Sequence, residues 1–153
     1  MQPANTFVHL VGVSHPSPAK AAQFEAIDKR SALEAIGVAK QSGVAHFVYI
    51  SVAHPAPAMH AYIAARSARE QALIESGIHA TILRPWYVLG PGHWWPYALL
   101  PFYKMAELIP STRESALRLG LVTIAQMTNA LAWSVENPAT GARVIEVPQI
   151  RAV

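Results

Sequence analysis

The sequence predicts an α/β fold built on a parallel sheet, and two observations support this. Three short runs are apolar and rich in β-branched residues along their whole length, which is typical of strands buried on both faces. They are Thr6–Val13, Ala45–Ser51 and His79–Arg84. Longer stretches with helical periodicity separate these runs, and strands joined through helices pair in parallel by right-handed crossovers. We therefore expect a doubly wound sheet with helices on both faces.

The two connecting helices have recognisable ends. A serine cap and a first-turn proline open a helical stretch over 17–41, which Asp28 can divide by capping a second segment. Gly43 then supplies the left-handed residue that ends a helix. After a proline-rich loop, a second helix is expected over Met59–Ser76, with Gly77 as its stop.

The second half of the chain continues the pattern. An apolar, aromatic stretch with prolines covers Trp94–Tyr103, and a fourth strand is expected around Leu117–Val122. Thr123 can cap a helix over Ile124–Glu136, which carries apolar residues at helical spacing. A final short strand is expected over Ala142–Val147. The aromatic stretch can form core, wall a pocket for an apolar substrate, or rest on a membrane surface.

Composition excludes several classes of protein. The 153 residues are 52% hydrophobic and 14% charged, with a net charge of +3, which predicts a single folded domain over 1–153 and excludes a disordered chain. Cysteine is absent, so disulfides and thiolate zinc sites are excluded. No apolar run is long enough to cross a bilayer. We expect a cytoplasmic protein without an integral membrane segment.

Neither the basic residues nor the histidines form a recognisable site. The twelve lysines and arginines are scattered along the chain, whereas tracking of nucleic-acid phosphates needs a basic stripe. No two of the seven histidines have the i,i+4 spacing of a helical zinc motif. We expect no nucleic-acid partner and no metal site, although His15 and His54 follow predicted strands and can line a cleft there.

A proton-transfer set follows the predicted strands. Ligands of open parallel sheets bind beyond the carboxyl ends of the strands, where Ser51 ends one strand and Tyr62 opens the next helix. Arg66 shares a helix face with Tyr62. A cation beside a phenol stabilises the phenolate, and a serine hydroxyl orients a carbonyl or an alcohol. In the alternative interpretation, Tyr62 is an ordinary helix aromatic and Arg66 pairs with Glu70.

These segments resemble one enzyme family over most of the chain. The matching pieces are Phe7–Gly12, Gly43–Ser51, Tyr62–Arg66 with Glu70, Ile82–Gly92 and Leu121–Leu131. Together they resemble the carboxyl-terminal part of the extended or atypical short-chain dehydrogenases/reductases, the epimerase- and dehydratase-like Rossmann proteins. The Arg-Pro-x-x-Val-x-Gly-Pro-Gly stretch is the most specific of these matches. The resemblance implies a partial Rossmann fold and chemistry that uses NAD or NADP.

The resemblance also implies roles for individual residues. Ser51 matches the serine that polarises the substrate, Tyr62 matches the acid/base tyrosine, and Arg66 stands where the family has lysine. The cofactor-binding positions that it implies are Val11 and Gly12 beside the ribose and phosphates, and Pro85 and Val88 beside the nicotinamide. Arginine and lysine are both cationic, but they differ in shape and hydration, so the exchange is not conservative.

A second departure from the family concerns its first half. A dinucleotide site needs a glycine-rich turn between a strand and a helix, and none precedes Phe7. The sequence thus predicts a truncated domain without the glycine-rich βαβ unit. Its first strand, Phe7–Gly12, then becomes an exposed apolar edge. We expect this edge either to pair with a second copy, giving a homo-oligomer such as a dimer, or to be covered by a terminal segment.

These residues are compatible with two functions. The first is NAD(P)-dependent oxidation, reduction or epimerisation of a small apolar alcohol or carbonyl compound by Ser51, Tyr62 and Arg66, impaired by the loss of the dinucleotide-binding half. The second is a non-catalytic binding or assembly module on the same scaffold. The retained serine and tyrosine favour the enzyme, and the missing glycine-rich turn favours the module.

Overall fold

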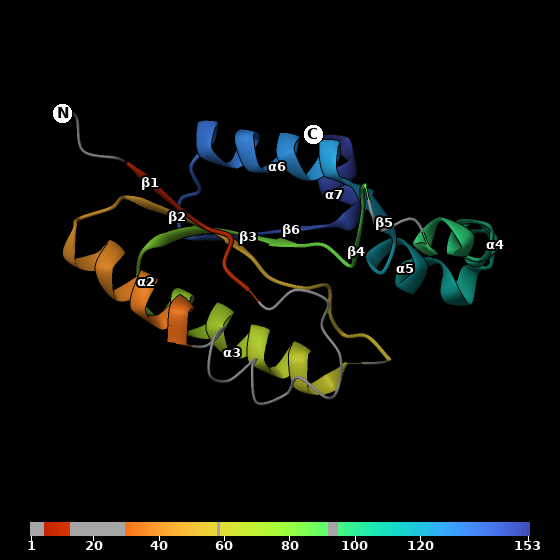
Figure 1. Ribbon diagram of the computed structural model, residues 1–153, viewed down its shortest axis with the longest axis horizontal. Helices are drawn as coiled ribbons and strands as arrows, with labels where there is room; N and C mark the ends of the chain where they lie inside the picture. The colour runs from red at the N-terminus through yellow and green to blue at the C-terminus, as the bar shows by residue number, and fades with distance from the viewer. Residues whose placement is uncertain (1–4, 13–29, 58, 92–94) are drawn as a thin grey trace.

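A four-stranded parallel sheet forms the centre of the molecule (Figure 1). The computed structural model describes residues 5–12, 30–57, 59–91 and 95–153. The strands lie in the order β1-β2-β3-β6 and all pair in parallel. Their bounds are Thr6–His9 (β1), His46–Ile50 (β2), His79–Arg84 (β3) and Ala142–Glu146 (β6). The predicted α/β class and the parallel pairing are confirmed.

Helices cover both faces of this sheet, because successive strand residues point to opposite sides. On one face, Phe47, Tyr49 and Ile82 pack against α2 (Arg30–Gln41) and α3 (His60–Glu75). On the other face, Val48, Leu83 and Ile145 pack against α6 (Ile124–Glu136) and α7 (Val147–Ala152). Figure 1 shows these two helical layers above and below the sheet. The strands are apolar on both sides for this reason.

The last crossover has the opposite hand to the first two. The chain moves in one direction across the sheet from β1 to β6, yet α2 and α3 lie on one face and α6 on the other. Crossovers between parallel strands of one sheet almost always have the same hand, so this one is an exception. The connection from β3 to β6 is long and passes through several other elements, so it reaches the opposite face.

This long connection forms a separate group at the carboxyl end of the sheet (Figure 1). It contains a two-stranded parallel sheet of β4 (Tyr87–Leu89) and β5 (Leu121–Thr123). Between these strands lie the 3-10 helix η3 (Trp95–Leu99) and the helices α4 (Leu100–Leu108) and α5 (Pro110–Arg118). None of the described helices is long and apolar enough to cross a membrane.

The strand predicted around Leu117–Val122 has different bounds in the structure. Leu117 and Arg118 are the last residues of α5, and the strand covers only Leu121–Thr123. It pairs with β4, so it does not extend the main sheet. Pro110 in the first turn of α5 favours a helix that continues through Leu117 and Arg118. The apolar run that forms β5 is too short to show a periodicity.

Local signals predict other elements closely. The predicted helix over Ile124–Glu136 has those bounds in the structure. Its capping box is complete, because the Gln126 amide donates to the Thr123 hydroxyl and the Thr123 amide donates to the Gln126 side chain. Of the helix predicted over 17–41, the structure describes α2, and Asp28 lies outside the described residues. The strand predicted over Thr6–Val13 is shorter, since its ladder ends at His9.

A buried histidine of β2, His46, contacts one residue of each neighbouring strand at the other end of the sheet. The His46 ring lies 3.0 Å from the Thr81 hydroxyl and 3.5 Å from that of Thr6. Burial lowers the pKa of His46, and the positive charges of Arg143 and His79 lower it further. Neutral His46 is therefore the form that the folded state favours.

We expect the free energy of unfolding to depend on pH through His46. The folded state binds the proton less readily than the unfolded chain, so the His46 contribution is complete above the ordinary pKa of about 6.5 and is lost as pH falls below it. Between pH 7 and 5, the free energy of unfolding measured by urea titration should fall less steeply for His46→Asn than for the natural chain. The exposed-site control His60→Asn should keep the natural slope, and equal slopes for all three proteins would contradict the assignment.

Candidate functional site

A cavity of about 300 Å³ opens at the carboxyl end of β2 and β3. Five of the seven site residues predicted from the sequence line it, and they are Ser51, Tyr62, Arg66, Pro85 and Val88. Ser51 directly follows β2, Tyr62 and Arg66 lie in the first two turns of α3, and Pro85 directly follows β3. Parallel pairing of β2 and β3 aligns these strand ends. The structure thus brings the predicted proton-transfer set together.

The remaining two predicted residues, Val11 and Gly12, follow β1 and do not line this cavity. Gly12 nevertheless lies against the site, because a Cβ atom at this position would be 2.2 Å from an Arg66 guanidinium nitrogen. The contribution of Gly12 in this structure is therefore room for the Arg66 side chain. Of the two histidines expected near the cleft, His15 lies outside the described residues, and His54 donates from Nδ1 to the Val52 carbonyl.

Arg66 is buried and connects α3 to the end of β2. Its Nη1 donates to the Ile50 carbonyl at 2.7 Å and to the Tyr49 hydroxyl at 3.4 Å, both at the end of β2. Its guanidinium carbon lies 5.3 Å from the centre of the Tyr62 ring and 5.8 Å from that of Tyr49. A positive charge is thereby held beside the Tyr62 ring, as the sequence predicts.

Glu70, the alternative partner of Arg66 in the sequence, is bound elsewhere. Its carboxylate accepts from Arg84 through two guanidinium nitrogens, with Nε at 3.1 Å. Arg84 also lies 3.6 Å from the Glu146 carboxylate. This pair of contacts joins α3 to β3 and β6, so Glu70 has a structural role between the helix and the sheet.

Ser51 supplies a hydroxyl that the surrounding protein leaves available. Its side-chain oxygen is buried and has no hydrogen-bond partner among the described residues. A buried hydroxyl without a partner is costly. Because Ser51 lines the cavity, a carbonyl or hydroxyl oxygen of a bound molecule would satisfy it.

Other residues of the cavity lining were not predicted from the sequence. Val52, Met59, Trp86 and Tyr87 also line it. Met59 has a left-handed backbone, with φ at 62°, a conformation that side chains with a Cβ atom rarely adopt and that often marks functional sites. Trp86 could have been predicted as a lining residue, because it directly follows the proline at the end of a predicted strand. No local sequence feature marks Met59.

Known proteins resemble this chain in structure. No family model and no curated protein matches the sequence. Solved structures do match: the Bordetella bronchiseptica enzyme WbmH in complex with NAD+ has a TM-score of 0.65 at 20% identity, over 93% of this chain and 52% of that chain. A short-chain dehydrogenase/reductase superfamily protein from Agrobacterium tumefaciens with bound NAD has a TM-score of 0.65 at 14% identity, over 97% of this chain and 64% of that one.

This chain has the fold of short-chain dehydrogenases/reductases. RMD from Pseudomonas aeruginosa, complexed with NADPH, adds a third match, with a TM-score of 0.62 and 15% identity over 95% of this chain and 59% of that chain. The resemblance stated from the sequence is thus confirmed for the fold, in the partial form that was predicted. The chain spans between about half and two-thirds of the length of these structures.

The residues of the site fit one end of a nicotinamide dinucleotide. Pro85 and Val88 give the cavity an apolar wall on which a nicotinamide ring can lie, and the hydroxyls of Ser51 and Tyr62 belong to the same cavity. The pyrophosphate end is different, because no glycine-rich strand–turn–helix motif occurs in the sequence. Among the described residues, no group of three histidine or acidic side chains is placed to hold a metal ion.

We expect Gly12→Ala to displace the Arg66 guanidinium, because its new Cβ would overlap a guanidinium nitrogen. Loss of the bond to the Ile50 carbonyl should lower the free energy of unfolding by about 1–3 kcal/mol in urea titrations. In an Arg66→Met background the same substitution should cost less than about 0.5 kcal/mol.

Gly37→Ala is the matched control for this double-mutant cycle of Gly12→Ala and Arg66→Met. Gly37 lies within α2 and a Cβ there meets nothing within 4 Å, so this change should stabilise the protein by about 0.5–1 kcal/mol. If Gly12→Ala lowers the free energy of unfolding equally with and without Arg66, the contact between Gly12 and the Arg66 guanidinium is contradicted.

Proposed function

We propose that the chain carries the proton-transfer site of an NAD(P)-dependent oxidoreductase or epimerase that acts on a small apolar alcohol or carbonyl compound. The observation that carries the proposal is the cavity shared by the free Ser51 hydroxyl, Tyr62 and the anchored Arg66. The fold match to NAD- and NADPH-bound short-chain dehydrogenases/reductases supports it. The non-catalytic alternative offers no reason for an unpartnered buried hydroxyl at this place.

Each residue of the site has a role in this chemistry. Ser51 donates its hydroxyl hydrogen to the substrate oxygen and thereby positions and polarises it. Tyr62 gives its phenolic proton to that oxygen during reduction, or removes a proton from it during oxidation. Arg66 stabilises the negative charge left on Tyr62, since its guanidinium lies over the ring. Bound nicotinamide would supply or accept the hydride.

The same proposal assigns Pro85 and Val88 to the nicotinamide and leaves Val11 and Gly12 beside the cofactor at the end of β1. The rest of the dinucleotide would need a glycine-rich βαβ unit that this sequence does not contain. We expect that unit to lie along the outer edge of β1, next to Gly12, because β1 is the edge strand of the described sheet.

Removal of the Tyr62 hydroxyl tests the catalytic role. Tyr62→Phe should lower kcat for reduction of apolar ketones with NADH or NADPH by about 10²–10⁴-fold, the usual contribution of a positioned acid. Thermal unfolding should change little, because Tyr62 is only half-buried. Tyr97→Phe, on η3 and outside the cavity, is the matched control. Unchanged activity in Tyr62→Phe would remove Tyr62 from the mechanism.

We also propose that β1 pairs with a second copy in the isolated chain. Its neighbour on one side is β2, and no described strand pairs with its other edge. Val8, Leu10 and Val11, in and after this strand, are exposed by 39%, 58% and 52%. A free apolar edge favours pairing between chains.

Sedimentation equilibrium tests the pairing. The chain should form a dimer, and Val8→Lys should raise the dimer dissociation constant by about tenfold or more, because a charge at an edge opposes pairing. Leu33→Lys, at an exposed position on α2, should leave it unchanged. A monomer at high protein concentration would contradict the proposal and would favour cover by a segment of the same chain.

A further inference from the structure

A second cavity lies between α4 and α5, outside the site described above. It has a volume of about 250 Å³, and the described residues that line it belong to these two helices or directly follow α5. Its lining includes Phe102, Tyr103, Ala106, Thr112, Ser115 and Leu119, so it is apolar apart from a few hydroxyl groups. The Thr112 hydroxyl donates to the Ala106 carbonyl at 2.8 Å and the Ser115 hydroxyl accepts from Arg118. We call this cavity the helical crevice.

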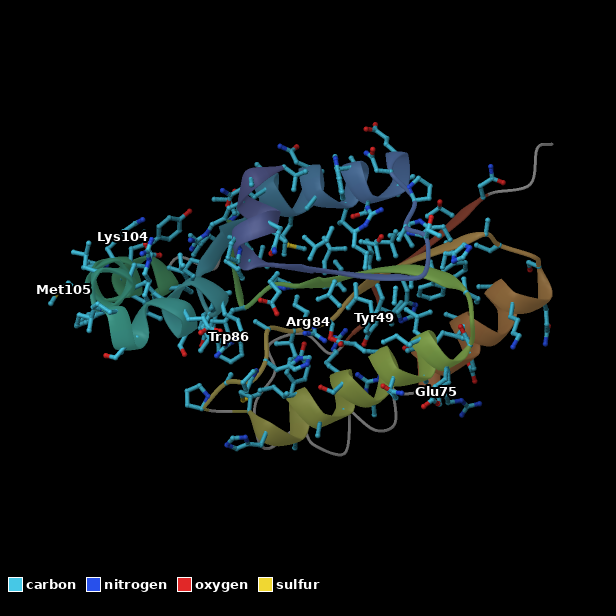
Figure 2. All side chains as sticks on the ribbon, turned by 180° about the vertical axis from the view of Figure 1, so that it is seen from behind. Tyr49, Glu75, Arg84, Trp86, Lys104 and Met105 are labelled. Atoms are coloured by element: carbon cyan, nitrogen blue, oxygen red, sulfur yellow. The ribbon has the colours of Figure 1, made fainter. Side chains whose placement is uncertain are left out.

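The helical crevice lies next to the cavity that is lined by Ser51, Tyr62 and Arg66, which we call the reactive cavity. Trp86 lines the reactive cavity and Tyr103 lines the crevice. The Trp86 and Tyr103 side chains lie near each other: burial raises the pKa of Tyr103, and the indole N–H of Trp86 lowers it in part. Figure 2 shows Trp86 at the end of the sheet that faces α4 and α5. Two neighbouring aromatic residues thus border the two cavities, Trp86 the first and Tyr103 the second.

The crevice exposes apolar side chains that the fold does not cover. No residue of α4 is buried, and Phe102, which lines the crevice, is 70% exposed. None of the described lining residues carries a charge. Such a surface suits a neutral hydrocarbon chain, whose methylene groups would leave water on binding. It offers no charged lining residue to a phosphate or a carboxylate.

We propose that the helical crevice binds the hydrocarbon chain of the substrate whose alcohol or carbonyl group lies between Ser51 and Tyr62. This inference rests on the proposed function and narrows its substrate class to amphiphilic alcohols and ketones with a neutral alkyl or prenyl chain. The chain would pass along the Trp86–Tyr103 pair, with its polar end in the reactive cavity. Chain length, rather than charge, would then decide affinity.

Fluorescence quenching by a brominated dodecanol tests the crevice without any turnover. The probe should quench tryptophan emission in a saturable way, because Trp86 lies beside its path. Ala106→Phe fills the crevice and should weaken binding by about tenfold or more. Leu108→Phe, on the same helix but 83% exposed and outside the crevice, should bind as the natural chain does. Absence of saturable quenching, or equal affinity of the two variants, would overturn the proposal.

Further measurements separate this inference from the proposed function. Ser115→Phe fills the crevice from α5, whereas Ala106→Phe fills it from α4. If both variants lose binding while their circular dichroism spectra are unchanged, misfolding of one helix is excluded as the cause. Probe binding without turnover of any ketone would refute the catalytic proposal and keep the crevice. Turnover whose kcat/KM is the same for butanone and for long-chain ketones would refute the crevice and keep the catalytic proposal.

Discussion

The contact of the Arg66 guanidinium with the end of β2 is the interaction on which the site depends. It donates to the Ile50 carbonyl and the Tyr49 hydroxyl while it lies over the Tyr62 ring. A side chain at Gly12 would occupy its place. The ends of β1 and β2 and the start of α3 are therefore held around one buried cation. The guanidinium is planar and carries five N–H donors, so it can donate to both oxygens while its face lies over an aromatic ring.

The two-sided sheet makes this arrangement possible. Parallel register aligns the ends of β2 and β3, and helices on both faces bury the strands, so only the loops after the strands are free to form a cavity. The long connection after β3 then places Trp86, α4 and α5 beyond the same end of the sheet (Figures 1 and 2). The polar site and the apolar crevice are consequently neighbours.

Prediction from the sequence succeeded where short-range signals were sufficient. Uninterrupted apolar runs predicted the main strands, and the Thr123–Gln126 box marked the start of α6. The spacing of Tyr62 and Arg66 predicted their shared helix face. The partner of Glu70 was ambiguous, because Arg84 approaches it only through the tertiary fold. The three-residue strands β4 and β5 were too short to show a period, and the left-handed Met59 has no local signature.

The central claim is that this chain holds the reactive end of a dinucleotide-dependent site. Calorimetric titration of the purified protein with NADH and with NADPH tests it most directly. We expect saturable binding of at least one of them, with a dissociation constant below about 1 mM because only the nicotinamide end is held, and weaker binding by an Arg66→Met variant. No detectable heat of binding at millimolar concentrations of either dinucleotide would contradict it.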